Sequence, residues 1–338
     1  MQINLKSIVE KGGSSFKGIS LLLCENPLPP LQEAIDAAKN ELPLSNFYTE
    51  PYSAKLRELL SRHCEVPISM VHINAGSELI LRQLFDLYGQ QVHLLTPTYV
   101  LFPQIARRYT ETRILPQDEF RFNLKDLSIP DATTLVVIVN PNNPNGLAMD
   151  LQALPKLLEK HKDTYFLVDE AFIGLAGRSV APLVPDYKNL MVTRTFSKAH
   201  SLAGFRVGYA ILPEHIAEHL NNNNDAYPLA RASEAAAIAT LQHAEKIHIR
   251  MKKLKLWARD LSESLQRLGI KTYPTEAYFF LADFAPLNAG AIARALEEKG
   301  FLLKPLDDVV LGEGYMRITT STPENNTQFI QTLKELLK

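Results

Sequence analysis

Five short, nearly continuous apolar runs alternate with longer amphipathic stretches between residues 71 and 212. The runs read QVHLLTP, TTLVVIVN, TYFLVDEA, MVTRTF and RVGYAIL. Strands that are apolar on both faces are typical of a sheet that helices cover on both sides. This section therefore predicts a doubly wound, mostly parallel sheet. Between the runs, residues 151–161 predict a helix with one apolar face, although Pro155 interrupts its first turns.

The pattern changes after about residue 234. A long helical stretch reaches Leu268, and the strand-like AYFFLADF, the helix AIARALEEKG and the strand-like YMRITTS follow. The last helix begins with Thr322 as N-cap and Pro323 in the first turn. The residues that its apolar face predicts to be buried are Phe329, Ile330, Leu333, Leu336 and Leu337.

This change of pattern predicts a second, smaller α+β domain. We place an N-terminal segment, which contributes to the small domain and to dimer contacts, at residues 1–45. The large domain then covers residues 46–235, and the small C-terminal domain covers residues 236–338.

Composition and charge narrow the class of protein. The 36 basic and 37 acidic residues nearly cancel, so no general field would attract nucleic acid or an anionic membrane. Cys24 and Cys64 lack metal-ligand spacing, and we expect no metal site. No signal peptide and no apolar run of about 20 residues is present, which predicts a cytoplasmic protein with small-molecule partners.

Polar groups stand at the ends of three predicted strands. TTLVVIVN runs into the turn PNNPNG with Asn143, TYFLVDEA carries Asp169, and MVTRTF is followed by Ser197 and Lys198. Arg206 begins the next strand. Ligands of open α/β sheets bind beyond the carboxyl ends of the strands, so we expect these groups to converge.

An amide, a carboxylate, a lysine, hydroxyls and an arginine at one place fit the chemistry of pyridoxal phosphate (PLP). The lysine forms a Schiff base with the aldehyde, and the carboxylate keeps the ring nitrogen protonated. Hydroxyls, the arginine and the N–H groups of a helix N-terminus bind the phosphate. Each residue alone also has an ordinary structural reading: Lys198 as a solvated side chain, Asp169 as a helix N-cap, Asn143 as a turn residue.

Several motifs in one order carry a resemblance to a known family. They are CENPLPP, NFYTEP, NAGSE, TPTY, PNNPNG, DEAF, SKAHSLAGFR and YMRITTSTPEN, from residue 24 to near the end of the chain. The chain resembles the class I and II, fold-type I PLP-dependent aminotransferases, and within them the histidinol-phosphate aminotransferase branch, whose relatives include threonine-phosphate decarboxylase. The resemblance implies a homodimer of fold-type I subunits, each with a large sheet domain and a smaller α+β domain.

The resemblance also implies roles for individual residues. Lys198 would be the Schiff-base lysine and proton carrier, and Asp169 the partner of the pyridine nitrogen. Asn143 would bind the phenolic oxygen, and Tyr99 would stack on the ring. The phosphate would be bound by Gly76, Ser77, Thr195, Ser197, Arg206 and, from a second subunit, Tyr48. The substrate would be bound by Arg317, Asn143 and Lys304. Tyr99 and Tyr48 could instead merely pack, and Arg317 could form a structural ion pair.

Four positions depart from the family pattern. Phe172 replaces a common Tyr, Asn145 replaces a Thr, Tyr278 replaces an Asn, and Lys304 replaces an Arg that helps to bind a substrate phosphate. Lysine keeps the charge but loses the bidentate fork of arginine.

We expect transfer of an amino group from an amino acid or amino-alcohol phosphate, histidinol-phosphate-like or aromatic, to an oxo acid such as 2-oxoglutarate. Two alternatives stay open: decarboxylation of a phosphorylated amino acid, and PLP binding without catalysis.

Overall fold

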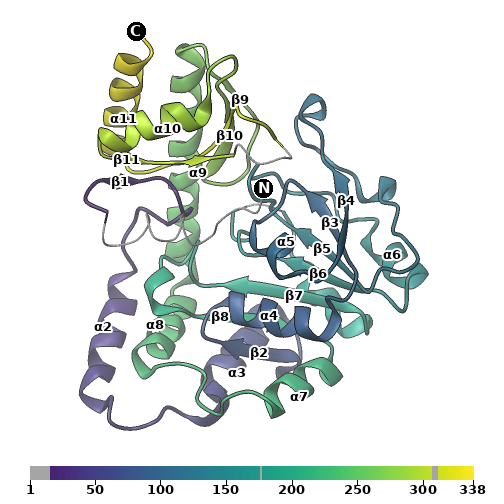
Figure 1. Ribbon diagram of the computed structural model, residues 1–338. Coiled ribbons are helices and arrows are strands. Elements are labelled where there is room, and N and C mark those ends of the chain that lie inside the picture. The colour runs from purple at the N-terminus through teal and green to yellow at the C-terminus, as the bar shows by residue number, and fades with distance from the viewer. Residues whose placement is uncertain (1–15, 176, 307–310) are drawn as a thin grey trace.

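A computed structural model describes residues 16–175, 177–306 and 311–338 of the chain. Its largest feature is a seven-stranded sheet in the order β2-β8-β7-β6-β5-β3-β4 (Figure 1). The strands are β2 (Val71–Asn74), β3 (Val92–Thr96), β4 (Tyr109–Arg113), β5 (Leu135–Val139), β6 (Tyr165–Asp169), β7 (Leu190–Thr195) and β8 (Gly208–Ile211). β8 runs antiparallel to its neighbours β2 and β7, and the other pairs are parallel. The predicted doubly wound, mostly parallel sheet is confirmed.

Helices pack on both faces of this sheet. Along β5 the alternate residues Val136 and Ile138 join one hydrophobic core, whereas Leu135, Val137 and Val139 join a second core on the opposite face. The helices of this part are α2 (Gln32–Glu41), α3 (Ala54–Cys64), α4 (Ser77–Tyr88), α5 (Leu101–Ile105), α6 (Leu154–Lys160), α7 (Glu214–Asn222) and α8 (Arg231–Gln242). Short 3₁₀ turns connect them: η1 (Leu42–Leu44), η2 (Pro51–Ser53), η3 (Ile68–Met70), η4 (Pro116–Asp118), η5 (Leu124–Asp126), η6 (Ala181–Asp186) and η7 (Ala203–Phe205).

A smaller four-stranded antiparallel sheet, in the order β12-β13-β10-β9, lies beside the large one (Figure 1). Its strands are β9 (Lys271–Thr272), β10 (Phe279–Asp283), β12 (Lys304–Pro305) and β13 (Tyr315–Thr319). With α9 (Ala244–Arg267), α10 (Ala289–Glu298) and α11 (Pro323–Leu336) it encloses a third core. Near the N-terminus, β1 (Ile19–Ser20) pairs in parallel with β11 (Phe301–Leu302) of this part.

Three details of the predicted helices differ from the structure. The helix predicted at residues 151–161 begins only at Leu154, because Pro155 is tolerated in a first turn but not further inside. The long helical stretch up to Leu268 is two helices, α8 and α9, separated at His243. Leu336 is 37% exposed at the end of α11, so its predicted burial was wrong. The Thr322 N-cap is confirmed, since its side chain accepts from the amide of Asn325.

Candidate active site

The carboxyl ends of β5, β6 and β7 lie side by side, because these strands are parallel neighbours in the large sheet. Asn143 lies in the turn after β5, Asp169 ends β6, and Lys198 follows β7 by three residues. The structure therefore brings the amide, the carboxylate and the lysine to one edge of the sheet, as the positions of the strand ends predicted.

Asp169 is a buried carboxylate whose residue is only 4% exposed. Its Oδ1 accepts from the amide of Ala171 at 3.1 Å and from the hydroxyl of Thr193 at 3.4 Å. Burial raises the pKa of Asp169 to about 6, and these two donors and the charge of Lys198 oppose the rise. Such a carboxylate gains most from a cationic partner that shares its burial, for example a protonated ring nitrogen.

The turn between β7 and β8 assembles a cationic and hydroxyl cluster. Because β8 is antiparallel to β7, the chain returns through η7 and places Arg206 at the carboxyl end of β7. Nη1 of Arg206 lies 3.5 Å from Oγ of Ser197, and the amide of Ser197 donates to Oγ1 of Thr195 at 3.1 Å. The structure thus brings these three predicted phosphate ligands together.

The N-terminus of α4 completes this cluster. Gly76 is its N-cap with φ of 90°, and a Cβ there would lie 2.5 Å from Nη2 of Arg206. A Cβ at Gly208 would lie 2.0 Å from the amide nitrogen of Ser77. The two glycines therefore permit a close approach that other residues would block. Free amides of a helix N-terminus, two hydroxyls and a guanidinium form a suitable site for a phosphate group.

Arg317 extends from β13 of the small sheet toward the large domain. Its Nη1 donates to Oδ1 of Asn143 at 2.8 Å, and the residue is 8% exposed. Its Nε is buried and has no hydrogen-bond partner among the described residues, so this donor is available to an anion. Lys304 pairs with Arg317 in the register of β12 and β13, which directs both side chains to the same face of the small sheet.

A segment near the N-terminus covers the lysine. We name residues 21–26 the N-terminal strap. The carbonyl of Leu23 accepts from Nζ of Lys198 at 2.7 Å, and the carbonyl of Leu22 accepts from Nη2 of Arg317. The side-chain amide of Asn26 donates to the carbonyl of Lys198 at 3.3 Å. Sequence reasoning found the motif CENPLPP but gave its residues no role, because a backbone carbonyl has no sequence signature.

The surroundings of Lys198 favour a neutral amine. Burial lowers its pKa, and the positive charges of Arg317 and Arg206 lower it further. Cys24 and Glu25 of the strap oppose this effect. Since the neutral amine is the nucleophile, the shift makes Lys198 more reactive toward an aldehyde near neutral pH.

Tyr99 lies at the same edge of the sheet. Burial raises its pKa to about 12, and the charges of Glu78 and Asp169 contribute to the rise. Its ring packs edge-to-face on Phe102, with centroids 5.8 Å apart at 87°.

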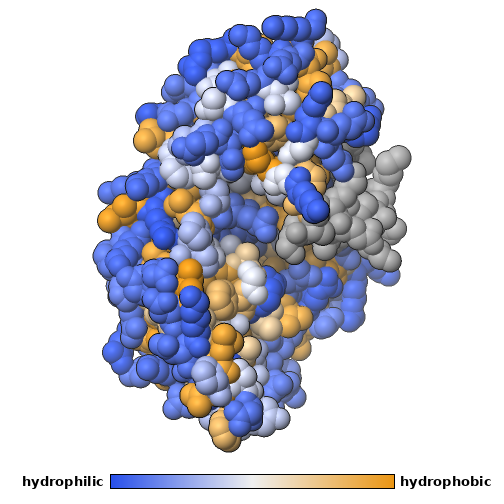
Figure 2. All heavy atoms as spheres, turned by 90° about the vertical axis from the view of Figure 1, so that its left-hand side faces the viewer, coloured by the Kyte–Doolittle hydropathy of each residue, from blue (hydrophilic) through white to orange (hydrophobic). Residues whose placement is uncertain are grey.

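Tyr48 is not brought into the cluster by its own chain. The residue is 77% exposed, and its ring stacks on Tyr227 with centroids 4.3 Å apart. Leu42 and Phe47 beside it are 59% and 63% exposed. Figure 2 shows apolar side chains along the face of the molecule that carries α2.

Two of the four residues that depart from the family pattern contact each other. Phe172 contacts Tyr278 edge-to-face, with centroids 6.1 Å apart at 74°. Asn145 is buried in its turn, where Oδ1 accepts from the amide of Leu147 at 3.2 Å and the side-chain amide donates to the carbonyl of Phe120 at 3.3 Å. Asn145 therefore stabilises the turn.

A buried ion pair lies behind the site. Nε of Arg194 donates to Oε2 of Glu170 at 2.8 Å, and Oε1 of Glu170 accepts from the amide of Val180 at 2.8 Å. Glu170 directly follows Asp169, so the pair fixes the chain next to that carboxylate. Sequence reasoning missed this pair, although an arginine inside the apolar run MVTRTF was a signal that it needs a buried partner.

The residues at this edge of the sheet fit PLP. The glycine-lined N-terminus of α4 would hold the phosphate, the buried carboxylate of Asp169 would hold the ring nitrogen, and Asn143 and Lys198 lie at the same edge of the sheet. In the described part of the chain, no helix is both long and apolar enough to cross a bilayer.

Comparison with known proteins gives one family across the chain. The family model described as aminotransferase class I and II matches residues 18–333. A curated histidinol-phosphate aminotransferase from Methanosarcina barkeri is 31% identical over 323 residues, which cover 93% of this chain and 87% of the relative.

Solved structures share the fold. A histidinol-phosphate aminotransferase from Sinorhizobium meliloti in complex with pyridoxal-5'-phosphate superimposes with a TM-score of 0.86 at 21% identity, over 100% of this chain and 95% of that chain. An L-threonine-O-3-phosphate decarboxylase from Porphyromonas gingivalis superimposes with a TM-score of 0.84 at 21% identity, over 94% of this chain and 99% of that chain. At these identities the likeness establishes the fold alone.

Proposed function

Because the chain belongs to the aminotransferase class I and II family, whose members are PLP-dependent transaminases, we propose that it transfers the amino group of a small anionic amine to an oxo acid. The donor would be an amino acid or an amino-alcohol phosphate, either histidinol-phosphate-like or aromatic, and 2-oxoglutarate would be a suitable acceptor. The observation that carries this proposal is the position of Lys198, at the same edge of the sheet as the buried carboxylate of Asp169 and bonded to the strap next to the buried guanidinium of Arg317.

Lys198, Asp169 and Asn143 would each have a different role in the reaction. Bound PLP supplies an aldehyde that links to amines and a ring that withdraws electrons from the α-carbon of the donor. Lys198 would hold the aldehyde through Nζ and, once freed, would move the proton of the α-carbon. Asp169 would keep a proton on the ring nitrogen. Asn143 would donate to the phenolic oxygen while it stays bonded to Arg317. Donor and acceptor would bind in turn, which gives ping-pong kinetics.

Arg317 and Lys304 support an anionic substrate. The unpartnered Nε of Arg317 offers a donor to a carboxylate or phosphate, and Lys304 lies opposite it on β12. The relative from Methanosarcina barkeri carries the name of an enzyme that acts on histidinol phosphate. A phosphorylated donor is therefore the first candidate.

Decarboxylation of a phosphorylated amino acid is the second candidate function. Phe172, which lacks the hydroxyl that many aminotransferases of this branch present to the phenolic oxygen, is compatible with either reaction. The decarboxylase from Porphyromonas gingivalis has the same fold, so this fold is compatible with the second reaction.

The assembly and location follow from the same proposal. The exposed Tyr48 and Phe47 suit a homodimer in which Tyr48 reaches the phosphate site of the partner. We place this dimer in the cytoplasm, with the N-terminal segment (residues 1–45), the large domain (46–235) and the small domain (236–338) as its parts. Residues 1–15 of that segment lie outside the described residues.

Absorption spectroscopy of the PLP-loaded protein tests the function. We expect a cofactor band that Lys198→Ala lacks, and its conversion to the amine form of the cofactor by a donor without added oxo acid. Histidinol phosphate and histidinol form a matched pair that differs only in the phosphate. Threonine phosphate is tested in parallel for release of carbon dioxide. A band of the same kind in Lys198→Ala would contradict the role of this lysine, and carbon dioxide release without amino transfer would favour the decarboxylase.

A further inference from the structure

Tyr278 connects three parts of the molecule. It lies directly before β10 in the small domain, is fully buried, and accepts the amide of Thr320 through its carbonyl at 2.9 Å. Its ring packs edge-to-face on Phe172 of the large domain. Its hydroxyl donates to the carbonyl of Cys24 in the N-terminal strap at 2.7 Å.

Three successive carbonyls of the strap therefore each accept from a side chain of the candidate site. The carbonyls of Leu22 and Leu23 accept from Arg317 and Lys198, and the next one accepts from Tyr278. Under the proposed function, on which this inference rests, Lys198 and Arg317 must exchange these acceptors for the cofactor and the substrate. The hydroxyl of Tyr278 has no such exchange to make, and burial raises its pKa well above the ordinary range, so it remains a donor.

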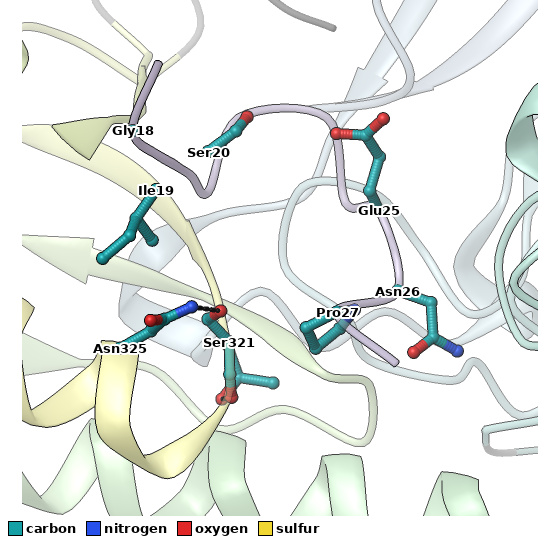
Figure 3. A pocket seen from close by; sticks show the side chains of 9 residues that line it. Gly18, Ile19, Ser20, Glu25, Asn26, Pro27, Ser321 and Asn325 are labelled. Atoms are coloured by element: carbon teal, nitrogen blue, oxygen red, sulfur yellow. Dashed lines mark hydrogen bonds between the residues drawn. The ribbon is translucent and has the colours of Figure 1, made fainter. Parts of the chain in front are cut away.

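Other contacts also hold the strap. The amide of Leu21 donates to the carbonyl of Leu302 at 2.8 Å, and Asn26 donates to the carbonyls of Lys198 and Ala199. A cavity of about 360 Å³ lies beside it, lined by residues 18–20 and 25–27 and by the start of α11 (Figure 3). Cys24 has φ of 50°, a left-handed conformation that a cysteine rarely adopts and that surrounding contacts must hold. Oγ1 of Thr319 lies 3.5 Å from its sulfur, which is a weak contact. The hydroxyl of Tyr278 thus bonds the strap at its one residue with a left-handed backbone, Cys24.

We propose that Tyr278 is a positioning residue, whose hydroxyl anchors the N-terminal strap across Lys198 and Arg317. The anchored strap keeps water from the amine of Lys198 and presents carbonyl acceptors to both cations until cofactor and substrate take their place. Tyr278 does this through the strap and does not touch the reacting atoms.

Cys24 offers a direct probe of the strap. It is 1% exposed, and the other cysteine, Cys64 in α3, is 3% exposed and lies outside the strap. Both thiols are free. An alkylating reagent can reach a buried thiol only when the structure opens locally or globally. The ratio of the two labelling rates therefore separates a local opening of the strap from a loss of overall stability.

The experiment compares two variants that each remove one buried hydroxyl. Tyr278→Phe keeps the ring on Phe172 and removes the bond to the strap. Tyr273→Phe is the matched control, because Tyr273 is also buried in the small domain and its hydroxyl bonds Tyr315 at 3.2 Å, away from the strap. PLP-loaded wild type and both variants are treated with iodoacetamide, and the labelled cysteine is identified by mass spectrometry.

Loss of one hydrogen bond predicts that Cys24 is labelled about fivefold to tenfold faster in Tyr278→Phe, while Cys64 is not. Tyr273→Phe leaves the rate of Cys24 unchanged. Equal acceleration of both cysteines, or of Cys24 in both variants, would overturn the proposal. Tyr278→Met is the second variant without the hydroxyl, should Tyr278→Phe not fold.

A pH profile adds a readout that a purely structural role would not move. The charged or titratable groups around Lys198 are Cys24 and Glu25 of the strap, Asp169 of β6, Arg317 of β13, and Arg206 next to β8. Tyr278→Phe substitutes none of these residues. A looser strap admits water, which returns the lowered pKa of Lys198 toward its ordinary value.

Half-maximal capture of added PLP by the PLP-free protein should therefore occur at a higher pH in Tyr278→Phe than in wild type or Tyr273→Phe. An unchanged profile overturns the positioning role. Because the labelling ratio can be read without any turnover, failure of this inference and failure of the transaminase assignment give different results.

Discussion

Arg194 and Glu170 form an ion pair with 2.8 Å between Nε and Oε2, in which the arginine side chain is 9% exposed and the glutamate side chain is inaccessible. Removal of one partner leaves the other charge buried and uncompensated. Arg194→Met should therefore lower the free energy of unfolding by about 3–5 kcal/mol in chemical denaturation.

Arg82→Met is the control, because its pair with Glu78 has side chains 47% and 43% exposed and should contribute less than about 1 kcal/mol. The double variant Arg194→Met with Glu170→Gln should regain part of the loss. Equal costs for the two single arginine variants would contradict this view of the pair.

Asp169 makes the stability of the PLP-free protein depend on pH. Its folded pKa of about 6 lies above an unfolded value of about 3.9, so the folded protein binds more protons between these pH values. Wild type therefore loses stability as the pH rises from 4 to 6, by at most about 3 kcal/mol, and this loss persists above pH 6.

Asp169→Asn should remove this loss. Without PLP the variant should match wild type at pH 4 and be more stable at pH 7, as measured by urea unfolding. With PLP bound the order should reverse, because the carboxylate then has its cationic partner. A stability difference that does not change with pH would show that the carboxylate is not desolvated.

Gly76 tests the phosphate cluster. Gly76→Ala would place a Cβ 2.5 Å from Nη2 of Arg206, and at a positive φ, so we expect the arginine to shift. Loss of one charge-assisted hydrogen bond predicts a dissociation constant for PLP that rises roughly tenfold to a hundredfold, measured by equilibrium dialysis. Gly204→Ala is the control in the same region, because no atom lies within 4 Å of its Cβ. Equal affinities in both variants would argue against the cluster as the phosphate site.

Lys304 tests the anionic end of the substrate. Lys304→Met should raise the KM for a phosphorylated donor about tenfold or more and leave the KM for its unphosphorylated analogue nearly unchanged. The exposed Lys299→Met serves as the control for a general loss of positive charge. A rise of KM for both analogues would instead assign Lys304 to the structure of the small sheet.

Tyr48 tests the dimer. Lys198→Ala and Tyr48→Ala should each be inactive or weak alone, but mixed and refolded together they should recover about one quarter of the wild-type activity. Half of the random dimers would be mixed, and in each of these one of the two sites would have both its lysine and its tyrosine intact. Recovery no greater than the sum of the separate variants would show that Tyr48 acts within its own chain.

The sequence predicted those parts whose signal is local. The five apolar runs matched β3, β5, β6, β7 and β8, because strands buried on both faces must be apolar throughout. It missed β4, whose residues YTETR are polar since this strand lies at the edge of the sheet. It also missed β2, which is only four residues long. No proline or glycine marks the break between α8 and α9 at His243, so the sequence did not predict it.

The same limit applies to the candidate site. Asn143, Asp169 and Lys198 were predictable because each stands at a strand end, and the neighbouring strands bring them together. Bonds across the chain were not predictable from spacing, such as Arg317 to Asn143, 174 residues apart, because tertiary packing alone decides them. The roles of all these residues remain predictions until the variants are measured.

The pairing of β1 with β11, and of Leu22 with Arg317 295 residues later, has a consequence for synthesis. Because translation runs toward the C-terminus, the strap is made before Lys198, and Arg317 is made after both. The large sheet can form while translation continues, but the carbonyl of Leu22 lacks its donor until β13 has emerged. A nascent or truncated chain that ends before β13 would therefore lack one of the bonds that hold the strap over Lys198.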